Sequence, residues 1–525
     1  MLRTSITKSS TALILALLAL SPAMAQQAAN WNLSFPTSES GPAQQHFLEG
    51  VTYMHLHMFE DAEMHFQMAQ ETAPDFAMAY WGEALAQHRT IWSIHRREQA
   101  RAILARLGAN PEARQAKAPT TREKTYLAAI ELLFGEGEQA DRELAYSNAM
   151  RALSLAYPDD IEAKAWYTLS LMRINSPGLT REQTRSLMAS LSLEILALNP
   201  RHPGANRYLI QSTDDPVNTD LGIIAVNNLQ RIETDAAEAL HIPSHYYLNH
   251  GMWIETADSN WQAFESSMAW VTENQWQLED LNAHNYGHLL QFANYGYLQS
   301  GQLAAAARIR ERVSKDYVAS NKAAEIGAPY ADVYARQLID LEQWQLAPEM
   351  AAMARQQALH DEGLWLAIGI GAARSGNLAL AREAVAVLSD MGSAASSEAG
   401  ISAREVQSLV LLAEGRMPEA LALLEETASI NLERPVTSLG VPPRPLKPVQ
   451  ELYGEVLLAA GDATAALEKF QLGLTLFRGR SNLLLGAARA ASASGQQALA
   501  NSYFSQLATA WRMADAGHPL QNQLP

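Results

Sequence analysis

The sequence contains no cysteine among its 525 residues. This absence excludes disulfide bonds, thiolate metal sites and cysteine nucleophiles. A chain of this length can bury a large hydrophobic core without covalent cross-links. Stability and chemistry must therefore come from noncovalent packing and from other side chains.

Basic residues are also scarce, with 39 Lys and Arg against 56 Asp and Glu and a formal net charge of −17. Nucleic-acid binding depends on neutralising phosphates, and no basic stripe interrupts the acidic chain, so we expect no nucleic-acid partner. The sequence has no GxSxG motif, no phosphate-binding glycine loop and no HExxH motif. It therefore indicates no reaction class and favours a non-catalytic protein.

Long apolar runs are limited to residues 12–20. Arg3 and Lys8 precede this run, a Ser-Pro pair follows it, and residues 23–25 read Ala-Met-Ala, a small-residue cleavage signal. The run is too short for a bilayer span, which needs roughly 20 apolar residues. We expect residues 1–25 to be a cleavable signal peptide, and the mature chain to be periplasmic or secreted without a transmembrane segment. An uncleaved N-terminal anchor is the alternative.

Internal repeats are the strongest signal in the chain. A set of small, aromatic and proline residues recurs at offsets 0, 3, 9, 12, 16, 19 and 24, namely Gly50, Tyr53, Phe59, Ala62, Phe66, Ala69 and Pro74. These offsets are typical of a tetratricopeptide (TPR) repeat, a helix–turn–helix unit of about 34 residues. Small residues allow two antiparallel helices to approach, aromatic residues fill the space between them, and the proline ends the second helix.

The same spacing returns in residues 454–470, and Gly461 and Gly495 lie 34 positions apart. Nine hairpins can be phased in this way, at 43–76, 77–107, 237–270, 287–320, 328–361, 362–395, 401–430, 447–480 and 481–514. The sequence therefore predicts an all-α, TPR-type helical-hairpin solenoid, an α/α superhelix.

The expected organisation has six parts. They are a signal peptide (1–25), N-terminal TPR hairpins (26–121), degenerate helical repeats (122–236), a central TPR array (237–432), a proline-rich connection (433–448) and C-terminal TPR hairpins (449–525). The connection contains five prolines, too many for a helix, and we expect it to run extended over the surface.

Several strings extend the likeness beyond generic repeat spacing: FAMAYWGEAL (76–85), HPGANRYLIQSTDDP (202–216), HIPSHYYLNHGMW (241–253), HLLQFANYGYLQSG (288–301) and PPRPLKPVQELYGEVLLAAG (442–461). In order and spacing they resemble a family of exported bacterial TPR-repeat proteins with HPGA…DDP and HxPSH motifs. The resemblance implies the fold more strongly than an activity. Where the family pattern has histidines, this chain has Arg207 and Gln211.

Three of the 14 histidines fall within residues 241–251. Pro243 favours a helix that begins there, which leaves His241 outside the helix and weakens the idea of an i,i+4 chelating pair. The positive end of the helix dipole favours a neutral imidazole at His245. His284 and His288 form a second pair at helical spacing. Imidazole ligands suit copper or zinc, so one hypothesis is a transition-metal site made of His241, His245, His284 and His288.

Repeat phasing places a second set of residues on the first helices of the hairpins, which line the concave groove of a TPR array. These predicted partner-binding residues are Phe47, His55, Trp81, His88, Arg89, Asn249 and Tyr295. The leading hypothesis is an exported scaffold that holds a peptide or protein in this groove. The metal site is the first alternative, and an enzyme with His245 as base is the second. The alternative structural explanation is that the same residues pack in the groove wall and the core. Separately, Asp215 is expected to cap a helix that starts at Pro216.

Overall fold

The computed structural model describes residues 31–172, 174, 178–278, 284–434 and 441–518. Within these residues the fold is all-α, apart from a hairpin of two short strands, β1 (His88–Arg89) and β2 (Ile94–His95). The expected signal peptide lies outside the described residues. None of the described helices is both long and apolar enough to cross a membrane.

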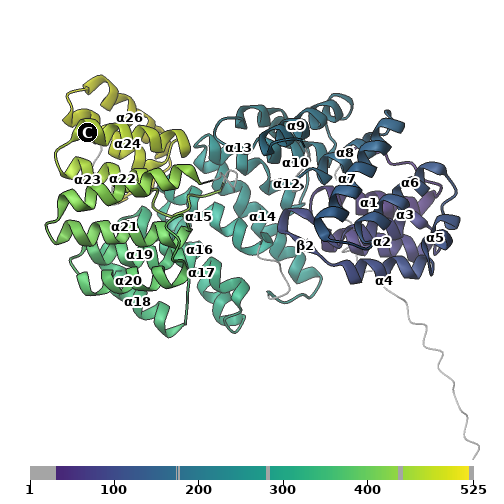
Figure 1. Ribbon diagram of the computed structural model, residues 1–525, viewed down its shortest axis with the longest axis horizontal. Helices are drawn as coiled ribbons and strands as arrows, with labels where there is room; N and C mark the ends of the chain where they lie inside the picture. The colour runs from purple at the N-terminus through teal and green to yellow at the C-terminus, as the bar shows by residue number, and fades with distance from the viewer. Residues whose placement is uncertain (1–30, 173, 175–177, 279–283, 435–440, 519–525) are drawn as a thin grey trace, which may run out of the picture.

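The helices form consecutive antiparallel pairs that stack along the chain (Figure 1). The first half contains α1 (Gly41–His55), α2 (Phe59–Thr72), α3 (Ala77–Leu85), α4 (Arg97–Leu107), α5 (Pro111–Lys117), α6 (Thr121–Leu133), α7 (Gln139–Ala156), α8 (Ile161–Ser170), α9 (Arg181–Leu198), α10 (Pro203–Ser212), α11 (Ile223–Leu229), α12 (Ala237–His241), α13 (Pro243–Asn249) and α14 (Trp253–Glu273).

The second half contains α15 (Leu289–Gln299), α16 (Leu303–Ala319), α17 (Ala324–Asp340), α18 (Ala347–Gln356), α19 (Glu362–Arg374), α20 (Leu378–Met391), α21 (Glu398–Ala413), α22 (Met417–Glu433), α23 (Val449–Ala459), α24 (Ala463–Leu476), α25 (Ser481–Ala493) and α26 (Gln497–Ala510). Short helical turns are η2 (Thr90–Trp92), η3 (Thr219–Gly222), η5 (His284–His288) and η6 (Trp344–Leu346). Eight of the nine predicted hairpins correspond to one of these consecutive pairs, and in the ninth, 237–270, α12 and α13 together take the place of the first helix and α14 that of the second. The TPR-type solenoid is therefore confirmed.

Buried phenylalanines explain why glycine recurs in the repeat pattern. Phe66 lies against Gly50 of its own hairpin and Gly82 of the next one, and a Cβ atom on either glycine would lie only 2.7 or 2.3 Å from the ring. Phe470 occupies the same position between two later glycines, Gly454 and Gly486. The repeat pattern therefore encodes a close approach of three helices around one aromatic ring.

Two glycine-to-alanine substitutions test this packing. Gly82→Ala is expected to lower the free energy of unfolding by about 1–3 kcal/mol, because the new methyl group overpacks against Phe66. Gly327→Ala, in α17, has ordinary contact distances of 3.5 Å and more, and should raise stability by about 0.5–1 kcal/mol through helix propensity. Urea denaturation followed by circular dichroism measures both. Equal effects of the two substitutions would contradict the repeat register.

Glycines also close the first helix of many hairpins, as the phasing predicted. Gly461 and Gly495 have φ angles of +88° and +78°, a left-handed conformation that glycine adopts without strain. At the first of these turns the Asp462 N–H donates to the Leu457 carbonyl at 3.0 Å. The turn thus satisfies carbonyls that the helix end would otherwise leave without a donor.

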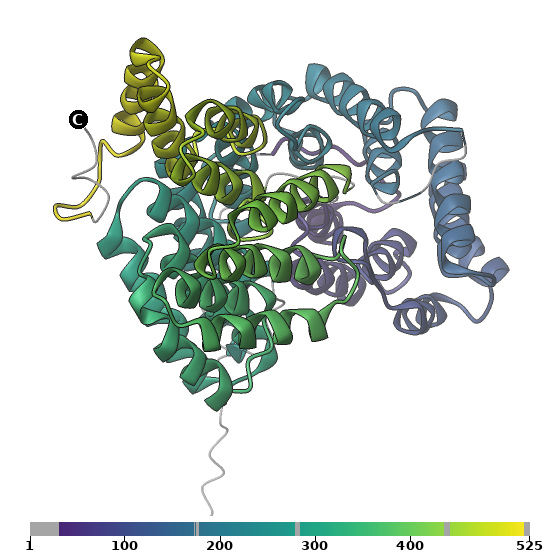
Figure 2. The ribbon, with the colours of Figure 1, turned by 60° about the vertical axis from the view of Figure 1, so that its left-hand side comes forward.

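The C-terminal hairpins curl back onto the middle of the chain (Figures 1 and 2). The buried Arg480 binds Asp340 of α17 at 2.6 Å and Glu451 of α23 at 2.6 Å. Ser481 donates its backbone N–H to Gln299 Oε1 of α15 at 2.9 Å. The second half of the array therefore forms a closed turn instead of an open rod.

The proline-rich connection differs from its prediction. The structure describes residues 433, 434 and 441–448 of it, and 441–448 do not run over the surface: Leu446 and Lys447 are buried. The Arg444 guanidinium binds Asp332 of α17 at 2.6 Å, and Arg336 donates to the Pro443 carbonyl at 3.2 Å. The segment, which bends at 442 and 444–447, is thus held against the helices by its own Arg444 and by Arg336 of α17, and composition alone does not reveal these contacts.

Candidate metal centre and the other histidine clusters

Most histidines gather with other histidines or with carboxylates. The described residues contain four groups whose nitrogen and oxygen atoms lie within 4.8 Å of one another: His241/His245/His288, His46/Glu49/His65, His55/Glu162/His202 and His88/His95/Glu143. Hydrogen bonds around each ring decide which nitrogens carry protons. This assignment separates the first group from the other three.

The first group begins at the junction of two short helices. As predicted, α13 starts at Pro243, but the inference that His241 lies outside a helix is wrong. Ile242 keeps helical angles, φ −57° and ψ −32°, so α12 and α13 continue across the proline. Pro243 stays in the helix because the first position of α13 needs no donor there. His241 and His245 therefore face each other one turn apart, with their Nε2 atoms separated by 3.1 Å.

Oxygen acceptors hold the other nitrogen of both rings. His245 Nδ1 lies 2.8 Å from Asp214 Oδ2. His241 Nδ1 lies 2.7 Å from Asn260 Oδ1, and the amide orientation is fixed because Asn260 Nδ2 donates to the Thr256 carbonyl at 2.7 Å. Both Nδ1 atoms are therefore placed to donate, and the two Nε2 atoms face each other.

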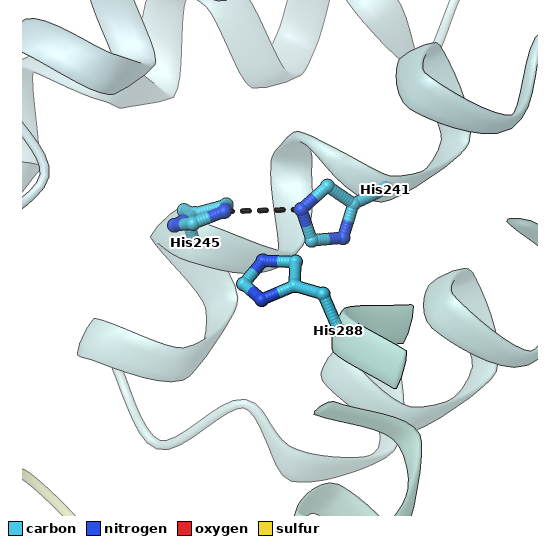
Figure 3. A group of neighbouring side chains, drawn as sticks. All are labelled: His241, His245 and His288. Carbon is cyan, nitrogen blue, oxygen red and sulfur yellow. Dashed lines mark hydrogen bonds between the residues drawn. The ribbon is translucent and has the colours of Figure 1, made fainter. Parts of the chain in front are cut away.

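His288 completes the group from the next hairpin. Its ring centroid lies 4.8 Å from that of His241 and 5.8 Å from that of His245, and Figure 3 shows the three rings turned toward a common centre. His288 ends η5, a π-helical turn, a feature often found at functional sites. The side chain of the predicted fourth ligand, His284, lies outside the described residues.

Two nitrogens that face each other at this distance can share a proton in a hydrogen bond or can both bind one metal ion. Two nitrogens bound tetrahedrally to zinc at roughly 2.0–2.1 Å lie about 3.3 Å apart, close to the observed 3.1 Å. Asp214 and Asn260 supply the outer hydrogen bonds that fix metal-binding imidazoles in the correct tautomer. The arrangement can therefore hold zinc or copper through three nitrogens.

The buried group around Glu162 needs no metal. Tyr208 O–H lies 2.8 Å from His55 Nδ1, and His55 Nε2 lies 2.8 Å from Glu162. His202 Nδ1 accepts the Ala205 N–H at the start of α10, which leaves its Nε2–H to donate to Glu162 at 3.1 Å. Burial lowers the pKa of His55. Every nitrogen has a matched partner, so this group joins α1, α8 and α10 structurally.

In the remaining two groups, ordinary hydrogen bonds of the ring nitrogens also explain the geometry without a metal ion. The Arg142 guanidinium, which can only donate, lies 3.1 Å from His95 Nε2, so His95 Nδ1–H donates to His88 Nδ1 at 2.9 Å. Burial and the nearby Arg142 lower the pKa of His88 to about 4.

In the last group the Nδ1 atoms of His46 and His65 lie 3.4 and 2.9 Å from the same Glu49 oxygen. Both N–H groups can donate to that oxygen, so this surface group needs no metal either.

The predicted partner-binding residues require correction. Phe47, His55, Trp81 and Tyr295 are at most 1% exposed, because the aromatic residues pack between helices and His55 binds Glu162. Arg89 is also buried and pairs with Glu60 and Glu63. His88 and Arg89 lie in β1 instead of a helix, and Asn249 donates to Asp214 at 2.8 Å. The predicted common histidine face is therefore a set of separate clusters.

Sequence reasoning missed Asp214 and Asn260 as supports of the histidine group. The Asp-Asp-Pro string contained the relevant signal for Asp214, because its two adjacent carboxylates can have different roles. Asp215 behaves as expected of a capping residue: its Oδ1 accepts the N–H groups of Val217 and Asn218, although they open a turn and not a regular helix. Arg207 instead forms a buried ion pair with Glu238 at 2.7 Å.

Comparisons with known proteins give no family assignment. No family model and no curated protein matches the chain.

Three solved structures share its helical character at low similarity. They are the APC/C hetero-tetramer Cut9–Hcn1 (13% identity, 89% of this chain and 94% of that chain, TM-score 0.32), yeast Tom70 (13%, 88% and 98%, 0.37) and the P58(IPK) TPR domain (10%, 87% and 99%, 0.21). The fold class therefore rests on the hairpins described above, and together with the site it defines a helical-repeat protein that contains clustered histidines.

Proposed function

We propose that this protein binds a transition metal ion, zinc or copper, through His241, His245 and His288. The observation that carries the proposal is the pair of facing Nε2 atoms 3.1 Å apart, each on a ring whose Nδ1 is placed to donate to a fixed acceptor. A metal ion at this centre accepts both lone pairs. Three imidazoles leave one position of a tetrahedral zinc ion for a further ligand.

The same geometry favours binding over catalysis. A general base must direct its free nitrogen at a substrate proton, whereas His245 Nε2 faces another histidine and His245 Nδ1 faces Asp214. We therefore assign His245 as a metal ligand and not as a base. With the expected signal peptide at residues 1–25, the proposal is an exported protein that handles a metal in the bacterial envelope.

Elemental analysis tests the proposal. Tag-free protein loaded with zinc or copper and then desalted should retain one equivalent of metal, and the variant His241→Ala/His245→Ala should retain less than about a tenth of an equivalent. The matched control is His46→Ala/His65→Ala. It removes a histidine pair whose geometry is explained by hydrogen bonds to Glu49, without a metal ion. Loss of metal from the control alone, or no metal in the wild type, would refute the assignment.

A second function, a scaffold for a peptide or protein, is supported by one separate observation. The helices α17 and α23 hold residues 441–447 of the same chain, an irregular segment with bends at 442 and 444–447, through Arg336, Arg444 and Lys447. A repeat surface of this kind suits a bound polypeptide segment. Mass spectrometry of the protein isolated from its native envelope tests this candidate, because a scaffold should carry a polypeptide in fixed ratio, and isolation of the chain alone would oppose it.

A further inference from the structure

A cavity of about 250 Å³ lies where the middle of the chain meets the C-terminal hairpins. Residues of α13, α14 and α15 line one side, and residues 441–444 with the ends of α22 and α24 line the other. Ligand sites often form at such junctions between parts of a fold. At roughly 30 Å³ per water molecule, the cavity holds about eight waters or a compact organic ligand of roughly ten non-hydrogen atoms.

The walls of this cavity are largely apolar and aromatic. Trp253 and Tyr295 stand edge to face, with ring centroids 5.4 Å apart, and Phe477 also lines the cavity. The Trp253 indole N–H donates to the Gly479 carbonyl at 3.0 Å, which fixes the ring in place. The wall therefore includes a fixed aromatic pair, and its apolar lining suits an apolar group.

Charge in the cavity opposes the charge of the whole protein. The chain has a formal net charge of −17, yet the lining contains three arginines, Arg434, Arg444 and Arg478, and one acid, Glu398. A concave site of one sign attracts ligands of the opposite sign. An anionic ligand is therefore favoured over a neutral or cationic one.

The three arginines differ in how far they are already engaged. Arg444 is paired with Asp332 at 2.6 Å. Arg478 donates one N–H to the Pro216 carbonyl at 2.6 Å and lies 3.7 Å from the exposed Asp220. Within the described part of the chain, Arg434 makes no hydrogen bond or ion pair. Arg434 and Arg478 thus have donors available for an anion at the edge of the aromatic cavity.

We propose that this cavity binds a small organic monocarboxylate with an apolar body. The carboxylate would be bound by Arg434 and Arg478 through charge-assisted hydrogen bonds. The apolar body would pack against Phe477, Leu432 and Val441, with the buried Trp253 and Tyr295 behind them. The site is distinct from the metal centre, although Asn249 joins the two: it lines the cavity and donates to Asp214, the partner of His245.

Isothermal titration with 3-phenylpropionate tests the proposal, with the uncharged 3-phenylpropionamide as the paired probe. The acid should bind with one site per chain, and the amide about tenfold more weakly or not at all. Arg434→Gln/Arg478→Gln should weaken acid binding by about tenfold or more. Val441→Phe should abolish it by filling the cavity while leaving both arginines in place. The matched control Arg489→Gln, in the lining of a different cavity, should bind as the wild type does.

Titrations of chelator-treated protein and of His241→Ala/His245→Ala separate this proposal from the metal proposal, since both should still bind the acid. Loss of binding in both would show that the carboxylate binds the metal and would overturn the cavity assignment. Equal affinity for acid and amide, unchanged affinity of the arginine variant, or no binding up to roughly 10 mM would also overturn it. Melting temperatures of the variants confirm that they are folded.

Discussion

Asp214→Asn should weaken zinc binding by about 10–100-fold while one site per chain remains. The Asp214 carboxylate accepts His245 Nδ1–H at 2.8 Å and Asn249 Nδ2–H at 2.8 Å. It therefore fixes the tautomer of His245 and increases electron density on Nε2. An asparagine has the same shape but no charge, and it can accept only one of the two donors without reorganisation.

Competition with a chromophoric chelator measures the affinity of this variant. The matched control is Asp220→Asn, which removes a carboxylate paired with a different histidine of the same region, His250, at 2.9 Å. The control should bind zinc as tightly as the wild type. If Asp214→Asn leaves the affinity unchanged, His245 does not coordinate the ion. Zinc binding can also be measured through protein stability. Free metal at a hundred times its dissociation constant adds about 2.7 kcal/mol to the free energy of unfolding.

Arg480→Met should lower the free energy of unfolding by about 3–5 kcal/mol, because it leaves buried carboxylates without their counter-charge. Arg480 is fully buried and binds Asp340 and Glu451, each at 2.6 Å. Methionine fills much of the volume, so loss of charge and not a cavity dominates the effect. Urea denaturation followed by circular dichroism measures it.

Arg355→Met is the matched control for this prediction. Arg355 pairs with Glu383 at 2.7 Å, but both side chains are exposed, at 50% and 41%. A surface pair of this kind contributes about 0–1 kcal/mol. Similar losses for both variants would mean that the Arg480 cluster is not the junction between α17, α23 and α25 that the structure indicates.

The hairpins could be predicted from sequence because their determinants are local. Gly50 and Phe66 belong to one repeat, and the spacing between them reports directly on how two neighbouring helices pack. The turn at Gly461 is equally local, since one residue with positive φ ends the helix. The repeat spacing of small and aromatic residues therefore located the hairpins.

The candidate metal centre was only partly predictable. His241, His245 and His288 were identified by type and spacing, but the rule that proline starts a helix wrongly removed His241 from the pair. Pro243 does begin α13, but His241 is the last residue of α12 and Ile242 keeps helical angles, so the two histidines still lie one helical turn apart. The roles of Asp214 and Asn260 depend on contacts between separate helices, and no local pattern encodes such contacts.

The predicted groove-lining residues were wrong for a different reason. Aromatic residues at repeat positions fit both a concave surface and a core, and for Trp81 and Phe47 the neighbouring helices cover the ring completely. The proline-rich connection was likewise judged by composition, which predicts an extended backbone but not whether other elements cover it.

The curled C-terminal half changes the mechanics of the array. In an open row of repeats each unit touches only its neighbours, so one end can fray or stretch while the rest stays folded. Here Arg480 and Ser481 fasten the last hairpins to helices more than a hundred residues earlier. This half should therefore unfold as one closed unit and not stretch gradually. Deleting its last two helices should destabilise α15 and α17 together. Pulling on its ends should meet resistance until the whole unit unfolds cooperatively.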